Sequence, residues 1–133
     1  MKYLSEYMET RQTELFKRTG TIFAFSVEQF EEGKKEGIKY SNLGQGMLTE
    51  KGNEIEVIEG LDLIYKESIV QDIKENGKDK IILRELCNHE AFYVGDIEDT
   101  KDKLEDYKCI EEKDIIRVYH KNYSKYADGF AIN

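Results

Sequence analysis

The chain has 133 residues, of which 39% are hydrophobic and 36% are charged, and it contains no proline. A chain of this length buries enough apolar surface for one core without disulfides or a metal, so we expect a single domain over residues 1–133. The formal net charge of −8 disfavours direct nucleic-acid binding and attraction to an anionic membrane, but it permits a basic protein partner.

Hydropathy and cysteine content indicate a cytoplasmic protein. The first residues, Met1–Glu6, lack the apolar core of a signal peptide, and no later run approaches the roughly 18 apolar residues of a membrane span. We therefore expect neither secretion nor membrane insertion. Cys87 and Cys109 form no disulfide framework and no CxxC motif, which predicts two reduced thiols that serve as small core residues.

The first third of the chain predicts a helix, a short strand and a second, shorter helix. Apolar residues recur at helical spacing over residues 3–18, and a glycine follows as a plausible stop. Residues 21–25 form an apolar run of β-favouring residues. Ser26 then begins a capping box with Gln29, in which each side chain satisfies a backbone donor of the other, and this predicts a helix over 27–35.

The middle of the chain predicts a hairpin and a long helix. Residues 38–41 and 47–49 read as strands around Gly44-Gln45-Gly46, which we interpret as a turn because a lone G-x-G lacks the longer phosphate-binding fingerprint. A helix is expected from Asn53 to Gly77, with a wide apolar arc that places it in the core. The residues of this arc are Ile55, Ile58, Leu61, Ile64, Tyr65, Ile69 and Ile73.

Three more helices are predicted in the last third, over residues 79–93, 97–107 and 111–126. Asp96 is placed to cap the second of them, because its carboxylate accepts hydrogen bonds from the free N–H groups of a first helical turn. The expected fold class is therefore α+β, with about six helices packed around a small, roughly three-stranded sheet.

The most unusual segment is Asn88-His89-Glu90, which continues through an aromatic pair to Asp96. If the helix over 79–93 is continuous, Glu90 falls near the middle of its apolar arc and His89 at the edge. A buried carboxylate needs a cation, hydrogen bonds or a proton. Glu90 is thus expected to be a structural acid, or to contact a ligand or act as a general base, unless the helix ends before it.

Neither a metal site nor a nucleophile is completed by this sequence. Glu85 and His89 share a helix face, but no third ligand stands at a recognisable spacing. Cys87 and His89 diverge by about 200° on a helix, which argues against a Cys–His pair, while Cys109 with His120 stays open. We expect no catalytic residue, no metal and no cofactor, and the balance leans against an enzyme.

The charge is distributed unevenly along the chain. Residues 113–133 carry a local charge of +2, which leaves −10 on residues 1–112. Arg117, His120 and Lys121 belong to a basic stripe on the last helix. Such a stripe is either a solvated helix face or a site for a phosphate-bearing ligand or an acidic patch of a second copy, which leaves a homo-oligomer open.

The segments Thr21–Gly33, Lys39–Gly46 and Asn88–Ile97 resemble a family of small uncharacterised proteins encoded by bacteriophages and mobile elements of gut Firmicutes and Bacteroidetes. The resemblance covers most of the chain and implies no biochemical activity and no site residue. It implies that the protein acts in a host cytoplasm, and proteins of this kind commonly act by binding.

Two hypotheses about function follow. The first is a non-enzymatic protein that binds a host protein, most concretely an anti-CRISPR or other anti-defence inhibitor. The second is a small-molecule or nucleotide-binding domain, with or without enzymatic activity, whose pocket is formed by Asn88, His89, Glu90 and Asp96.

Overall fold

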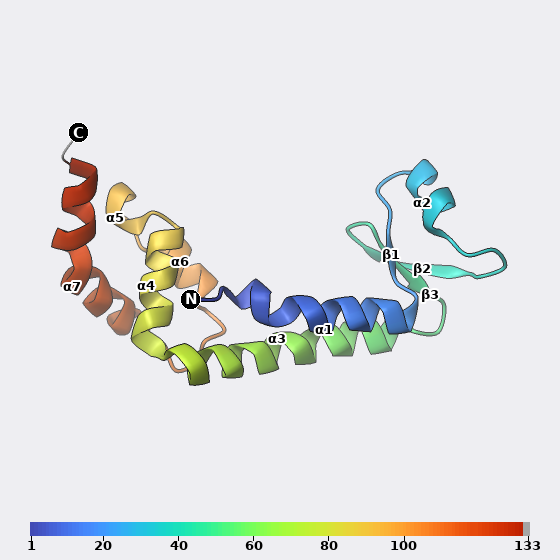
Figure 1. Ribbon diagram of the computed structural model, residues 1–133, viewed down its shortest axis with the longest axis horizontal. Helices are drawn as coiled ribbons and strands as arrows, with labels where there is room; N and C mark the ends of the chain where they lie inside the picture. Colours follow the sequence, from blue (N-terminus) through green and yellow to red (C-terminus); the bar gives the residue numbers. More distant parts are fainter. Residues whose placement is uncertain (132–133) are drawn as a thin grey trace. The chain divides into compact units, whose positions relative to one another are not determined.

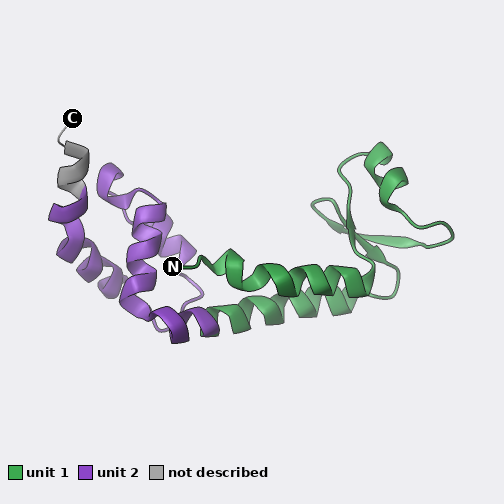
Figure 2. Cartoon of the chain, in the orientation of Figure 1, with its two compact units in different colours: residues 1–70 green, residues 71–133 purple. Residues whose placement is uncertain are grey.

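The computed structural model describes the backbone of residues 1–131 and the side chains of residues 1–126. Over the described residues the chain forms seven helices and a three-stranded antiparallel sheet, which confirms the predicted α+β class (Figure 1). The chain divides into two compact units, Met1–Val70 and Gln71–Asn133, coloured separately in Figure 2. The expectation of a single domain stays a prediction.

Two helices pack against each other in unit 1. Helix α1 spans Leu4–Thr19, and helix α3 spans Glu54–Asn76, of which the portion up to residue 70 belongs to this unit. The two helices lie side by side (Figure 1), because Gly60 has no side chain and Leu15, only 2% exposed, fills the space. A Cβ atom at Gly60 would come within 2.8 Å of a Leu15 methyl group.

The predicted apolar arc of α3 is wider than the surface that its neighbours cover. Ile64 and Ile69 are buried as expected, but Ile55 and Ile58 are 68% and 57% exposed. Val57, which was not assigned to the arc, is fully buried instead. The expectation that the whole arc lies in the core is therefore wrong at its N-terminal end.

The sheet of unit 1 has the strand order β1-β3-β2. Its strands are β1 (Ile22–Phe23), β2 (Tyr40–Gly44) and β3 (Met47–Glu50), with Ile22 opposite Leu48 and Tyr40 opposite Glu50. Gln45 and Gly46 join β2 to β3 with φ angles of 52° and 80°. Two successive positive φ angles are the geometry of a tight hairpin turn, so the predicted hairpin is confirmed.

Hydroxyl groups join α1 to the sheet. Thr19 and Thr49 are completely buried, and the Thr49 hydroxyl donates to the Thr19 carbonyl at 3.1 Å. Thr21 Oγ1 bridges the two, at 2.7 Å from Thr19 Oγ1 and 3.1 Å from Thr49 Oγ1. Asn53 Nδ2 also donates to the Thr19 carbonyl, at 3.0 Å. The end of α1, β1, β3 and the start of α3 thus meet at a buried group of neutral hydrogen bonds.

Helix α2 (Val27–Gly33) packs against β1, where Gly33 lies against the Ile22 side chain. The predicted cap is present, because the Ser26 hydroxyl accepts a hydrogen bond from the backbone N–H of Gln29 at 3.2 Å. The return bond differs in detail: Gln29 Oε1 accepts from the N–H of Phe25 at 2.7 Å, not from that of Ser26. None of the seven residues of α2, all of which the structure describes, is buried.

Unit 2 contains the end of α3 and four further helices, α4 (Lys78–Asn88), α5 (Ala91–Val94), α6 (Glu98–Lys103) and α7 (Glu112–Ala131). Its core is formed mainly by large apolar side chains. Phe92 stacks on Tyr119 and Tyr126 of α7, with ring centroids 5.1 and 5.0 Å apart. The buried apolar residues are Ile81, Ile82, Leu86, Ala91, Phe92, Leu104, Tyr107, Ile115 and Val118.

Several sequence-based boundaries in unit 2 are wrong. The helix expected over 79–93 is interrupted, because α4 ends at Asn88 and Glu90 takes a left-handed conformation with φ of 54°. The helix expected over 97–107 ends early, and its last residues form turns. Cys87 and Cys109 are exposed, so the expectation that they are core residues is also wrong.

Candidate functional site

An apolar groove opens between α2 and the sheet of unit 1. It has a volume of about 360 Å³ and is lined by Ala24, Phe25, Ser26, Val27, Phe30 and Leu48, and we refer to it as the apolar groove. Phe25 and Val27 stand at its mouth and are 75% and 77% exposed. Since large apolar side chains are normally withdrawn from water, two neighbouring ones this exposed at a cavity indicate a contact surface.

The cap of α2 and the hairpin turn fix the position of Phe25 in this groove. The Ser26 cap starts α2 directly after Phe25, and the Gln29 side chain fixes the N–H of Phe25. The Phe25 ring lies against Gly46 of the hairpin turn, where an added Cβ atom would come within 2.5 Å of the ring. Gly46 therefore has two roles, since it supplies the positive φ of the turn and leaves room for Phe25.

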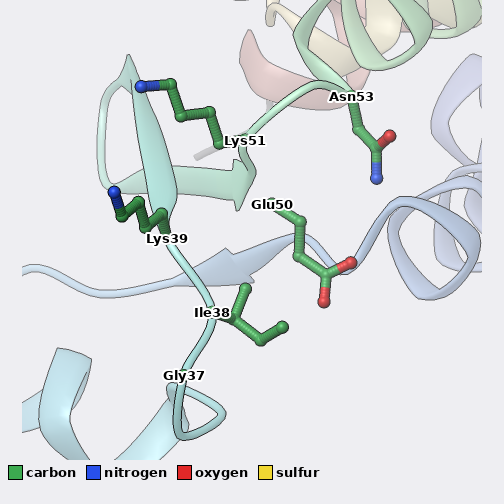
Figure 3. A pocket seen from close by; sticks show the side chains of 6 residues that line it. All are labelled: Gly37, Ile38, Lys39, Glu50, Lys51 and Asn53. Carbon is green, nitrogen blue, oxygen red and sulfur yellow. The ribbon is translucent and has the colours of Figure 1, made fainter.

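A second cavity of about 490 Å³ lies at the start of β2 and the end of β3, lined by Gly37, Ile38, Lys39, Glu50, Lys51 and Asn53. Figure 3 shows Lys39 and Lys51 on one side of it and Glu50 extending to the other. Glu54, the first residue of α3, accepts hydrogen bonds from the hydroxyl of Ser41 in β2 and from the N–H of Gly52 in the turn before the helix. These hydrogen bonds, that of Ser41 first, lower the pKa of Glu54. The cavity is open, and its lining combines the cations of Lys39 and Lys51 with the carboxylate of Glu50.

Unit 2 contains a buried charge network around Arg84. The guanidinium donates to both carboxylate oxygens of Asp72 at 3.0 Å each, and its Nε donates to Glu85 Oε2 at 2.6 Å. Tyr107 and Asn76 also donate to Asp72, at 2.6 and 2.8 Å. Asp72, Glu85 and Tyr107 are at most 1% exposed and Arg84 is 8% exposed, so this network is part of the core.

The protonation equilibria of the network reflect these bonds. Burial alone would raise the pKa of Asp72, but the hydrogen bonds from Arg84, Tyr107 and Asn76 outweigh burial, and the net shift is downward. Burial would lower the pKa of Arg84, but its bonds to Asp72 and Glu85 raise it. Burial and the bond to Asp72 both raise the pKa of Tyr107. At neutral pH Asp72 is therefore a carboxylate, Arg84 a guanidinium and Tyr107 a neutral phenol.

Two buried polar atoms of unit 2 have no hydrogen-bond partner within the described residues. They are Glu85 Oε1 and His89 Nε2, which lie 3.7 Å apart. This distance is just beyond hydrogen-bond length. His89 thus lies against the open side of the Arg84 network, at the C-terminal end of α4.

The comparison with protein families decides the chain's relationship. The model of a family of unknown function, DUF7659, matches residues 4–126. The chain belongs to DUF7659. No curated protein and no solved structure matches it.

The predicted site residues of this DUF7659 chain at the α4–α5 corner are mostly exposed. Asn88, Glu90 and Asp96 are exposed, and His89 is half-buried. The expectation that Glu90 lies on the buried face of a continuous helix is wrong, and the alternative that the helix ends before it is confirmed, because α4 ends at Asn88 and Glu90 is exposed in a left-handed conformation. Asp96 accepts a hydrogen bond from the N–H of Glu98, the first residue of α6, at 2.9 Å. The N-cap residue of α6 is Ile97, however, so the expectation that Asp96 is the cap is wrong by one residue.

The basic stripe of this DUF7659 chain is partly neutralised. Arg117 forms a two-pronged ion pair with Asp79 of α4, at 3.0 and 2.7 Å, and lies 3.7 Å from Asp114. His120 and Lys121 are exposed on α7, and the His120 ring is edge-on to Tyr119 with centroids 5.6 Å apart. Arg117 therefore links α7 to α4. Of the three predicted residues of the stripe, His120 and Lys121 remain candidates for contact with a ligand or partner.

Sequence reasoning missed both the apolar groove and the Arg84 network. The network had a signal, because Arg84 and Glu85 stand inside the apolar run Ile81–Leu86, where a solvated charge is out of place. No sequence signal indicated the groove, since an apolar run such as 21–25 is equally typical of a buried strand.

Among the described residues of this DUF7659 chain, no group of three or more histidine, cysteine, aspartate or glutamate side chains lies close enough to hold a metal ion. Within the same residues, every helix is too short or too polar to span a bilayer.

Proposed function

We propose that the protein acts by binding another protein through the apolar groove of unit 1. The observation that carries this proposal is the exposure of Phe25 and Val27, at 75% and 77%, at the mouth of a cavity of about 360 Å³. Burying a side chain of this size contributes about 1.5–3 kcal/mol, and aromatic residues placed in pockets dominate the energy of protein interfaces.

The weak packing of α2 supports the same proposal. Helices shorter than about 12 residues are marginal in water and normally depend on tertiary contacts. The seven residues of α2, each one described, bury no side chain, and the helix meets the sheet through Phe30, whose ring centroid is 5.6 Å from that of Tyr40, and through Gly33 against Ile22. A partner seated in the groove would supply the cover that α2 lacks.

The experiment compares three forms of the protein as bait in a lysate of the natural host. These are the wild type, Phe25→Asp, and Ile55→Asp as a matched control, because Ile55 is an apolar residue of unit 1 with a similar exposure of 68%. We expect one protein to be captured by the wild type and by Ile55→Asp but not by Phe25→Asp. Equal capture by all three forms, or no specific capture, would contradict the proposal.

The concrete form of this proposal is that the partner belongs to a host defence system, as in an anti-CRISPR or other anti-defence inhibitor. The resemblance of Thr21–Gly33 to proteins of bacteriophages and mobile elements supports it, since that segment contains Phe25, Val27 and α2. A host that expresses the protein should then be infected more readily by a phage that the host's defence restricts. Phe25→Asp should remove this effect, and an unchanged plaque count with the wild type would contradict the anti-defence role.

A second candidate function is small-molecule or nucleotide binding at the α4–α5 corner. The observation that favours it is the left-handed backbone at Glu90, φ 54°, next to the unpartnered His89 Nε2. A left-handed non-glycine residue costs about 1–2 kcal/mol, and such strain is concentrated at functional sites. A thermal-shift screen with nucleotides and cyclic nucleotides tests this function, with Glu90→Gln as the comparison. If no compound shifts the wild type, or if both forms respond equally, the α4–α5 corner is not a ligand site.

A further inference from the structure

We infer that unit 1 binds a second copy of itself through an exposed face of α3, with the two α3 helices antiparallel and Leu63 of each copy seated beside Gly60 of the other. The residues of this face, which we call the outward face, are exposed, and they are Ile55, Glu59, Leu63, Lys66 and Val70. The inference goes beyond the proposed function, because none of these residues lines the apolar groove.

The outward face of α3 presents large apolar side chains to solvent. Ile55, Leu63 and Val70 are each more than half exposed. At about 100° per residue, Val70 lies about 20° from Leu63 around the helix and Ile55 about 80° from it, whereas the buried Val57 lies about 120° away on the side opposite to Ile55. Because the three exposed side chains gather on one side of the helix, they indicate a contact surface.

A cavity of about 150 Å³ lies between α1 and α3, directly beside this face. Its lining includes Arg11, Leu15 and Arg18 of α1 and Gly60, Leu63 and Ile64 of α3. Gly60 contributes no side chain to it. The charges around it are paired within the protein, since Arg18 lies 2.7 Å from Glu56 and Arg11 lies 3.4 Å from Glu67. A cavity bordered by neutralised charges suits an uncharged side chain from a partner.

A second copy of α3 offers such a side chain when it runs in the opposite direction. In a dimer with a two-fold axis each contact occurs twice, and in an antiparallel helix pair centred beside Leu63 the residues whose numbers add up to about 125 lie opposite each other. Leu63 of each copy then meets the segment 60–64 of the other, as a knob enters a hole between two helices. Ile55 meets Val70 in the same arrangement, so that all three exposed apolar residues are covered.

The charges of the outward face select the same direction. Glu59 and Lys66 also add up to 125, so an antiparallel pair places each glutamate opposite a lysine, whereas a parallel pair in register would place like charges together. Glu59 has no ion pair among the described residues. Lys66 pairs with Asp62 at 2.8 Å and keeps further N–H donors for a second carboxylate. The face is therefore complementary in shape and charge to its own rotated copy.

The test is sedimentation velocity of the full-length chain over a wide range of protein concentrations. We expect a monomer–dimer equilibrium whose dissociation constant rises about tenfold or more in Leu63→Asp, because the change places a charge in two symmetric apolar contacts. Ile58→Asp is the matched control and should leave the constant unchanged. Ile58 is 57% exposed and Leu63 54%, but Ile58 lies about 140° away on the same helix.

A charge exchange tests the direction of the two helices without altering the apolar contacts. Glu59→Lys or Lys66→Glu alone places like charges opposite each other twice in the dimer, and each should raise the dissociation constant about three- to tenfold at low salt. The double variant Glu59→Lys, Lys66→Glu restores both ion pairs with reversed sign. Its dissociation constant should return to the value of the wild type.

The outcomes separate this inference from the proposed function. A wild type that stays monomeric throughout, equal weakening by Leu63→Asp and Ile58→Asp, or a double variant as weak as the single ones would overturn the inference. Phe25→Asp should dimerise like the wild type, because Phe25 lies outside the outward face. Loss of partner capture by Phe25→Asp is therefore measured independently of dimerisation.

Discussion

The interiors of the two units differ in how they hold polar groups. Unit 1 buries neutral hydroxyls, with Thr19 and Thr49 at 0% exposure, whereas unit 2 buries full charges on Asp72, Arg84 and Glu85. A buried hydroxyl with its partners contributes on the order of 1 kcal/mol, but a buried ion leaves a much larger penalty when its partner is removed. The stability of unit 2 therefore depends on a complete network of charged groups, whereas the stability of unit 1 depends on several weaker contacts.

The largest expected effect comes from Arg84. Arg84→Leu leaves two buried carboxylates without their cation, so we expect the free energy of unfolding to fall by about 3–5 kcal/mol. Urea denaturation followed by circular dichroism measures this loss. The matched control is Arg117→Leu, which removes an ion pair with Asp79 that is about half exposed on both sides and should cost under about 1 kcal/mol. Similar losses in the two variants would show that the buried network has no special weight.

Acid should affect the two interiors differently. The pKa of Asp72 is lower in the folded state than its ordinary value of 3.8. A carboxyl of this kind adds stability that is fully present above its unfolded pKa and is lost as the pH falls through its folded pKa. The stability difference between the wild type and Asp72→Asn should therefore be constant near neutrality and shrink below about pH 4.

Denaturation of both forms between pH 7 and pH 2.5 measures this dependence. Glu54→Gln in unit 1 is the comparison, because the pKa of Glu54 is also lowered but its carboxylate is only half-buried at the start of α3. We expect the same direction with a smaller amplitude. If the stability difference for Glu54→Gln depended more strongly on acid than that for Asp72→Asn, the expected contrast between the two units would be reversed.

A smaller effect is expected from the hydroxyl group of unit 1. Thr49→Val keeps the shape of the side chain but removes a donor to the Thr19 carbonyl and an acceptor for Thr21. The expected loss is about 1–2 kcal/mol in the free energy of unfolding, measured in the same urea titration. Thr13→Val serves as control, because its hydroxyl bonds the Glu9 carbonyl on the exposed side of α1. A loss as large as that of Arg84→Leu would remove the distinction between the two interiors.

Elements with strong local signals were predictable from the sequence. Gly20 ends α1 with φ of 66°, Ser26 caps α2, and Gly46 closes the hairpin, each as its residue type indicated. These features depend on the preferences of single residues, which a sequence displays directly. The class of fold follows from them.

Features that depend on tertiary cover were not predictable. The end of α4 at Asn88 has no glycine or proline to mark it, so a continuous apolar pattern placed Glu90 inside a helix that the chain does not form. Periodicity also could not show that Ile55 and Cys87 are exposed, because it identifies an apolar face without identifying what covers it. For the same reason, the sequence did not indicate that Phe25 is exposed.

The smallest expected effect on stability is that of Phe25→Asp, and this makes it the most informative variant about function. Phe25 is 75% exposed, so replacing it should change the free energy of unfolding by no more than about 0.5 kcal/mol. A loss of partner binding at unchanged stability would then come from the groove and not from the fold. A stability loss above about 2 kcal/mol would show instead that the Phe25 ring on Gly46 supports the hairpin, and the exposed residues of unit 1 would have to be interpreted as part of its packing.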